Sequence, residues 1–360
     1  MDPKKTVLIT GVAGYWGSRV AHKLLAERSW EVAGLDAEAR AEEVPGLDFV
    51  QADIRNPLLV DLLKAKHVDT VCHLAFIDTQ RLGEAAFDLN VMGTAKLMGA
   101  CAAAGVRKIV LKSSMAVYGA RATNSAFLSE DRPLRGSRRY GYLRDMVEIE
   151  AFCADFRDRE PDLLLTILRF SSIVGPTVDT PMTRFLQEPW APSLLGFDPM
   201  MQLVHEDDVV DALVHAVRQD LPGVYNIAAE GVLPLSKVRA LSGKPPIPIF
   251  HKLADWGVAL PGGANRLLER FLPIEPNYIR FPWVGDLTKM HKEFSFLPSR
   301  TPEETLIESA QRFNTGRDWA RSARVPSSAG TRPDASEQPG LAADGKPPTA
   351  SAVGEGDAGV

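Results

Sequence analysis

The chain has 360 residues, and its 41 Lys and Arg against 46 Asp and Glu give a formal net charge of −5. This mildly acidic balance argues against a protein that binds mainly nucleic acid or an anionic membrane surface. Hydrophobic residues make up 45% of the chain, which allows a sizeable core, and the length predicts one large domain or two closely packed ones.

The cysteine and histidine patterns predict neither a disulfide framework nor a metal site. Cys72, Cys101 and Cys153 are too few and too widely spaced for either, so we expect reduced cysteines in the core. No apolar run approaches the ~20 residues that a membrane span needs. We therefore predict a cytoplasmic protein that acts on a small molecule, binds no nucleic acid and does not span a membrane.

Short apolar runs alternate with helical patterns over residues 1–175. The expected strands are 7–10, 31–36, 47–52, 68–74, 108–112 and 163–170, and the expected helices are 15–26, 90–104 and 140–156. This alternation is typical of a parallel sheet with helices on both faces. The fold class that it predicts is α/β, with a Rossmann-type doubly wound parallel sheet.

The pattern becomes less regular and richer in Pro after residue 175. A strand at 202–204, a helix at 207–218, a strand at 224–228 and a helix at 235–241 predict a smaller α/β lobe over 176–320. Residues 321–360 are rich in Gly, Pro, Ala and Ser and contain no aromatic residue. Such a composition predicts a disordered tail.

A glycine-rich turn connects the first expected strand to the first expected helix. Gly11 permits a tight turn, Gly14 lets the backbone approach a pyrophosphate, and Gly17 lets the helix pack closely on the sheet. Asp36 ends the second strand, where a carboxylate accepts ribose hydroxyls and repels a 2′-phosphate. The pattern predicts NAD rather than NADP, although nearby Arg40 weakens that preference, and Asp36 could instead be a solvated turn residue.

Several motifs occur together in one order along the chain. They are TGVAGYWG at 10–17, HLAF at 73–76, NVMGT at 90–94, SSMAVYG at 113–119, LRFSSIVGP at 168–176, VHEDD at 204–208 and YNIA at 225–228. Together they resemble extended short-chain dehydrogenases/reductases, and specifically the NAD-dependent epimerase/dehydratase family, over about residues 5–315. The resemblance implies NAD as cofactor and a homodimer formed through helices 90–104 and 140–156.

The resemblance also implies a division of the chain and a set of cofactor-binding residues. The division is an NAD-binding Rossmann domain at 1–175, to which some later segments return, a substrate-binding lobe at 176–320 and the tail. The implied cofactor-binding residues are Gly11, Gly14, Tyr15, Trp16, Gly17, Asp36, Asp53, Ile54, Leu74, Ala75, Asn90, Ser113, Tyr140 and Arg144.

The catalytic residues that the resemblance implies are Ser114, Tyr140 and Arg144. In the family a Tyr is followed four residues later by Lys, and this spacing on a helix places both on one face. Here the second residue is Arg144, which supplies the charge that lowers the pKa of Tyr140 from about 10 but cannot relay a proton. Tyr118 and His205 are interpreted as structural residues.

Other positions bear on the substrate. Family dehydratases carry an Asp-Glu pair where this chain has Met115 and Ala116, so dehydration is disfavoured. Sugar-nucleotide epimerases usually have Asn at the position of Ser172 and a diphosphate-binding Arg at the position of Met201. The candidate replacements for that arginine are Arg169, Arg184 and Arg280.

The second lobe is rich in large apolar residues, including Trp190, Leu194, Leu195, Phe197, Met200, Trp256 and Trp283. They would suit a hydrophobic substrate, or they could simply form a core and a lid; peripheral membrane contact by 250–275 is a third possibility. We predict an NAD-dependent oxidoreductase or epimerase acting on a secondary alcohol or ketone, with sugar-nucleotide 4-epimerisation as one form. The alternatives are an enzyme similar to 3-beta-hydroxysteroid dehydrogenases and an NAD-binding regulatory protein with weakened catalysis.

Overall fold

The computed structural model describes residues 4–27, 29–39, 44–79, 81–188, 191–249, 274–310 and 313. A seven-stranded sheet, in the order β11-β6-β5-β4-β1-β2-β3, occupies the centre, and all of its strand pairs are parallel. Its strands are β1 (Lys5–Thr10), β2 (Trp30–Asp36), β3 (Leu47–Gln51), β4 (Val68–His73), β5 (Lys108–Ser114), β6 (Leu164–Phe170) and β11 (Gly223–Ile227). The predicted doubly wound parallel sheet is confirmed.

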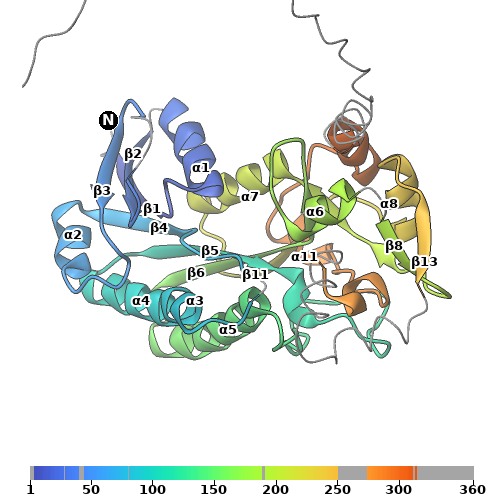
Figure 1. Cartoon of the computed structure of the whole chain (residues 1–360). Helices are drawn as coiled ribbons and strands as arrows, with labels where there is room; N and C mark the ends of the chain where they lie inside the picture. The colour runs from blue at the N-terminus through green and yellow to red at the C-terminus, as the bar shows by residue number, and fades with distance from the viewer. Residues whose placement is uncertain are drawn as a thin grey trace, which may run out of the picture.

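Helices cover both faces of this sheet. One face carries α1 (Tyr15–Ala26) and α7 (Glu206–Arg218), and the other carries α2 (Leu59–Ala65), α4 (Gly93–Ala104) and α5 (Gly141–Arg159) (Figure 1). Successive residues of β1 show why its apolar run is continuous. Val7 and Ile9 belong to the core beneath α1 and α7, whereas Leu8 belongs to the core beneath α4 and α5.

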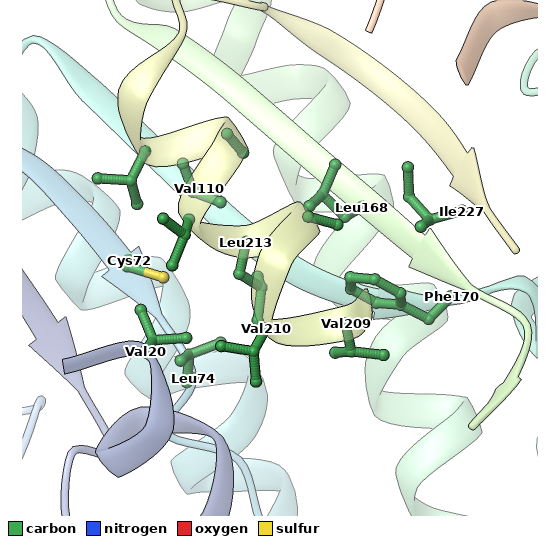
Figure 2. Close-up of a cluster of buried hydrophobic side chains, with 14 of the residues drawn as sticks. Val20, Cys72, Leu74, Val110, Leu168, Phe170, Val209, Val210, Leu213 and Ile227 are labelled. Carbon is green, nitrogen blue, oxygen red and sulfur yellow. The ribbon is translucent and has the colours of Figure 1, made fainter. Parts of the chain in front are cut away.

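Helix α7 comes from the second half of the chain but packs on the sheet. Figure 2 shows Val209, Val210 and Leu213 of α7 against side chains of α1 and the central strands, including Val20 and Phe170. Strand β11 likewise joins the edge of the sheet beside β6. The chain therefore returns to the sheet after the second lobe has begun.

The second lobe is small and built from short elements. Among the described residues it contains three two-stranded pairs: β7 (Ser172–Val174) with β10 (Leu203–His205), β9 (Met200–Met201) with β12 (Leu233–Pro234), and β8 (Ala191–Leu194) with β13 (Pro246–Ile249). Its described helical elements include α6 (Pro181–Gln187), α8 (Leu235–Leu241), a 3₁₀ turn at Pro276–Ile279 and a helical segment at 302–310. Helix α11 (Thr288–Lys292) instead packs Met290 into the core beneath α1 and α7. The predicted α/β lobe is confirmed, while the segment 250–273 and the tail 321–360 lie outside the described residues.

Two expected helices differ from the structure at their N-termini. The helix expected at 90–104 is preceded by α3 (Glu84–Phe87) and a π-helical turn at Asp88–Met92. The helix expected at 140–156 spans 141–159, and Tyr140 is its N-cap in an extended conformation. The first helical residue must be glycine, because a Cβ on Gly141 would lie 2.2 Å from the carbonyl oxygen of Arg81.

The three cysteines are free and buried, as predicted. In the part of the chain that the structure describes, no helix is long and apolar enough to cross a membrane.

A buried ion pair joins α5 to β6. Arg169 is 4% exposed, and its Nη2 lies 2.6 Å from Oε2 of Glu150, which is also 4% exposed. The Arg169 Nη1 donates to the Tyr118 hydroxyl at 2.7 Å and to the Glu130 carbonyl at 3.0 Å. Ser113 donates its hydroxyl to the same Glu150 carboxylate. These bonds offset the cost of burying two charges, and they leave Arg169 unable to reach a substrate phosphate.

We predict that Glu150→Gln lowers the free energy of unfolding by about 3–5 kcal/mol, because it leaves the guanidinium of Arg169 buried without a counter-charge. The matched control is Asp158→Asn, which removes a carboxylate from an exposed pair with Arg157 and should change stability by less than about 0.5 kcal/mol. Urea unfolding followed by circular dichroism measures both. Equal effects of the two substitutions would contradict the importance assigned to the buried pair.

Candidate active site

The glycine-rich turn is shaped by close backbone approaches. Gly11 has a φ of 72°, and a Cβ there would lie 2.8 Å from the backbone of Ala75. A Cβ on Gly17 would lie 2.2 Å from the carbonyl oxygen of Gly11. Gly14 is the N-cap of α1, so the first amides of the helix open onto the turn. This cradle at a helix N-terminus fits the pyrophosphate of a dinucleotide.

A hydrogen-bonded chain beneath the turn holds the loop that follows β4. The Thr10 hydroxyl bonds Nδ1 of His73 at 2.7 Å, and Nε2 of His73 bonds the Thr94 hydroxyl at 2.9 Å. Thr10 Oγ1 also accepts from the backbone amides of Leu74 and Ala75. Burial lowers the pKa of His73 to about 3, so this histidine is neutral. These hydrogen bonds place Leu74 and Ala75 directly beside the glycine-rich turn.

Asp36 lies at the end of β2, next to the same turn. Its carboxylate accepts from the amide of Ala13 at 2.9 Å and from the amide of Glu38 at 3.1 Å. Each carboxylate oxygen has about two acceptor positions, so capacity for ribose hydroxyls remains.

Asp53 and Ile54 follow β3. Arg55 binds the Asp53 carboxylate with its side chain and holds the pKa of Asp53 below its usual value. Ile54 is 3% exposed, and its Cδ1 would lie 2.7 Å from a Cβ on Gly93. The side chain of Ile54 therefore packs against α4.

Asn90 and Arg144 share Asp145 as a partner. The Asn90 amide exchanges hydrogen bonds with the backbone of Ile77 and donates to Oδ2 of Asp145 at 2.9 Å. Arg144 donates from Nε and Nη2 to Oδ1 of Asp145 at 2.9 and 2.7 Å, and its guanidinium lies over the ring of Phe87 at 4.8 Å. The two predicted cofactor-binding residues thus belong to a network that holds the loop after β4.

A pocket lies between the ends of the strands and the second lobe. It brings together Trp16 from the first turn of α1, Ser114 from β5, and Tyr140 from the N-cap of α5. From the second lobe and its connections, Ser172, Ile173, Met182, Met201, Ile274 and Trp283 complete much of the wall. Three residues predicted from distant motifs therefore meet in one mostly apolar pocket.

The two neighbouring serines of β5 have different surroundings. Ser114 Oγ accepts from the amide of Ala116 at 3.2 Å and caps the 3₁₀ turn Met115–Tyr118, which leaves its hydroxyl proton available. The hydroxyl of Ser113 is instead directed to Glu150, on the α5 side. The Tyr118 hydroxyl donates to Oδ1 of Asn226 at 2.7 Å, which fits its interpretation as a structural residue.

Lys112 and Asp78 are pocket residues that the sequence analysis missed. Nζ of Lys112 lies 5.3 Å from the centroid of the Trp16 ring. Burial lowers the pKa of Lys112 to about 8, with Asp78 acting in the opposite direction. Burial also raises the pKa of Asp78, which Lys112 counteracts. A charged residue directly after the apolar run Ile109–Leu111, two positions before Ser114, was the signal available in the sequence.

Two of the candidate phosphate-binding arginines, Arg184 and Arg280, are not among the residues that line this pocket. Arg280 stacks over the rings of Phe197 and Phe281, at 4.7 and 4.9 Å. Arg184 donates to Asp179, a residue of the pocket wall, at 3.0 Å.

Tyr15 and His205 join the two parts of the chain. The Tyr15 hydroxyl bonds Thr177 at 2.7 Å, and burial raises the pKa of Tyr15 to about 12. His205 is 1% exposed and caps α7 by accepting from the amide of Asp207 at 3.1 Å. Within the described ranges, no three His, Cys, Asp or Glu residues gather as metal ligands would.

The apolar residues of the second lobe divide between core and surface. Met201 and Trp283 line the pocket and also belong to the lobe's core, together with Leu194. Leu195 and Met200 are exposed. Trp190 and Trp256 lie outside the described residues.

Comparison with solved structures shows the fold. A UDP-glucose 4-epimerase from Thermotoga maritima, solved with UDP-glucose, has a TM-score of 0.66 and 21% identity, covering 86% of this chain and 99% of that chain. A dTDP-glucose 4,6-dehydratase from Bacillus anthracis, solved in complex with NAD, has a TM-score of 0.65 and 19% identity, covering 88% of this chain and 98% of that chain.

Sequence comparison shows the family as well as the fold. An uncharacterised protein from Mycobacterium tuberculosis is 34% identical over 315 residues, covering 84% of this chain and 82% of the relative. UDP-glucose 4-epimerase 1 from Oryza sativa subsp. japonica is 31% identical over 191 residues, covering 48% of this chain and 52% of the relative. Residues 7–228 match the NAD dependent epimerase/dehydratase family. The chain therefore belongs to the NAD-dependent epimerase/dehydratase family of enzymes.

Proposed function

We propose that the protein oxidises a secondary alcohol, or reduces the corresponding ketone, with NAD as its cofactor. The observation that carries the proposal is the single pocket that joins Ser114 and Tyr140 to Trp16, in the first turn of α1 after the glycine-rich turn. A hydroxyl, a phenol and a dinucleotide-binding turn at one pocket are the parts that such a reaction requires. A regulatory protein without turnover would not need the first two.

The cofactor's proposed place follows from the glycine cradle and its neighbours. The turn at Gly11 and Gly17 would hold the pyrophosphate, and Asp36 would accept the adenosine ribose hydroxyls. When bound there, NAD supplies the acceptor for a hydride. Arg144 stays the candidate for binding the second ribose that the motif predicts.

The chemical roles of the protein side chains are then distinct. The Ser114 hydroxyl donates a hydrogen bond to the reacting oxygen, and the Tyr140 phenolate takes the hydroxyl proton of the alcohol. Because an ordinary Tyr has a pKa of about 10, its use as a base near pH 7 requires about 4 kcal/mol of electrostatic stabilisation. Epimerisation uses the same residues, provided that the ketone rotates in the pocket before the same hydride returns to it.

The wall of the pocket favours oxidoreduction or epimerisation over dehydration. Met115 is buried and Ala116 lines the pocket at the positions where family dehydratases carry an acidic pair. The likeness to UDP-glucose 4-epimerases supports a sugar-nucleotide 4-epimerase as one form of the proposal. Met182, Met201 and Trp283 instead favour a more apolar alcohol, as in an enzyme similar to 3-beta-hydroxysteroid dehydrogenases.

We predict that Tyr140→Phe lowers turnover by a factor of roughly 10²–10⁴ while NAD binding stays nearly intact, because the substitution removes only the base. The control is Tyr225→Phe, which should leave turnover unchanged because the Tyr225 hydroxyl, on β11, donates to the carbonyl of Pro222 and does not line the pocket. NADH formation with a panel of secondary alcohols, and interconversion of UDP-sugars, measure activity. Undiminished turnover in Tyr140→Phe would show that the catalytic assignment is wrong.

We predict a preference for NAD over NADP that depends on the charge of Asp36. Asp36→Ala should weaken NAD binding about tenfold by removing a charged acceptor. Asp36→Asn can still accept from Ala13, but it no longer repels a 2′-phosphate, so its affinity for NADP should rise. Calorimetric titrations with both dinucleotides measure these changes. A wild-type protein that binds NADP more tightly would contradict the prediction.

We further propose a homodimer through α4 and α5. A groove between these helices is lined by Gly99, Ala102, Ala103 and Phe152, and small residues permit close helix approach. Ala103→Arg should shift sedimentation from dimer to monomer at micromolar concentration. Ala122→Arg, on the exposed loop after β5, should leave the dimer intact. A monomeric wild-type protein would contradict this proposal.

A further inference from the structure

The position of Lys112 on β5 directs it to the same side as Ser114. Side chains alternate along a strand, so residues two apart face one way and the residue between them faces the other. Lys112, Ser113 and Ser114 all line the pocket, but the hydroxyl of Ser113 is bound by Glu150 on the α5 side. The lysine therefore lies one pleat behind Ser114 on the same wall.

The surroundings of Lys112 differ from those of the other lysine of β5. Lys108 is fully buried, and its ammonium donates to the carbonyls of Val217 and Gln219 and to Asp220. Lys112 instead has its ammonium near the face of Trp16, with no hydrogen-bond partner among the described residues. Lys108 is thus bound by the fold, while the charge of Lys112 is directed to the pocket.

The guanidinium of Arg144 is committed elsewhere. It forms two hydrogen bonds with Asp145 and lies over Phe87. Asp145 is fully buried and also accepts from Asn90, so the Arg144 charge is balanced inside this network. Among the described residues that line the pocket with Tyr140, Lys112 is the one Lys or Arg.

We propose that the ammonium of Lys112, attracted by Asp78, stabilises the phenolate of Tyr140 and so performs the electrostatic role that the motif assigns to the residue four positions after the tyrosine. The inference rests on the proposed function, in which Tyr140 is the base. Lys112 acts through Tyr140, so it is a positioning residue. Its amine comes from a strand rather than from the helix that follows Tyr140.

The other titratable groups of the pocket do not cancel the stabilisation of the Tyr140 phenolate by Lys112. The titratable groups that face it from neighbouring elements are Asp78, Tyr142, Asp179, Glu275 and Tyr278. Burial raises the pKa values of Asp78 and Glu275, and Lys112 acts in the opposite direction on Asp78. Asp179 is bound by Arg184. The pKa of Lys112, about 8, keeps its ammonium mainly protonated at pH 7.

The test is a pH titration of tyrosinate absorbance, which needs no substrate. The difference between each protein and its Tyr140→Phe counterpart isolates the titration of Tyr140. Because Lys112 itself has a pKa of about 8, its effect on Tyr140 is read at pH 8 and below. Lys112→Met and Lys112→Gln should each lower the tyrosinate fraction of Tyr140 at pH 8 roughly tenfold, because a neighbouring positive charge is lost. Lys112→Arg should retain at least the wild-type fraction, and Arg144→Met should change it by less than about twofold.

Two results would overturn the inference. One is a tyrosinate fraction at pH 8 that Lys112→Met and Lys112→Gln leave within about twofold of the wild type, and the other is an equal fall in Arg144→Met. Circular dichroism melting identifies which variants fold. If either Lys112→Met or Lys112→Gln does not fold, the other neutral replacement still provides the test. Undiminished turnover in Tyr140→Phe would reject the proposed function alone, because the titration does not depend on turnover.

Discussion

The buried ion pair between Arg169 and Glu150 is the interaction on which the geometry of the site depends. Taking two charges out of water costs several kcal/mol per ion, so the pair is tolerated only because every nearby polar group is used. Those partners are Ser113 at the end of β5, Tyr118 in the following turn and the backbone of Glu130. Helix α5 is thereby bound to β6 and to the strand that carries Ser114.

A second set of contacts fixes the loop after β4 against the cofactor turn. From one side, Thr10 holds the amides of Leu74 and Ala75 through a hydroxyl that also bonds the neutral His73. From the other, Asn90 holds the backbone of Ile77 and is itself held by Asp145. The loop is thus supported at both ends before it reaches Asp78. Rigid support of this kind allows a pocket to hold charged groups without collapsing around them.

Much of the fold and part of the site followed from local sequence patterns. The strand at 5–10 and the helix at 15–26 lie within a few residues of their expected bounds, because apolar periodicity and glycine turns are properties of neighbouring residues. Short elements such as α2, α6 and β9 were not predicted, since a few residues carry too little periodicity. The requirement for glycine at position 141 comes from the close approach of the distant residue Arg81, which no local pattern indicates.

The sequence by itself determined the sheet, the glycine-rich turn, and the residue types that meet at the pocket. Gly11 and Gly17 are needed for backbone geometry that depends on immediate neighbours, so their spacing was sufficient evidence. Only the tertiary structure decided which charges meet. Arg144 forms an ion pair with Asp145, and Arg169 forms one with Glu150. Asp78, from the loop after β4, interacts electrostatically with Lys112 of β5. Electrostatic partners are chosen by distance in space and by burial, and both depend on how separate elements pack.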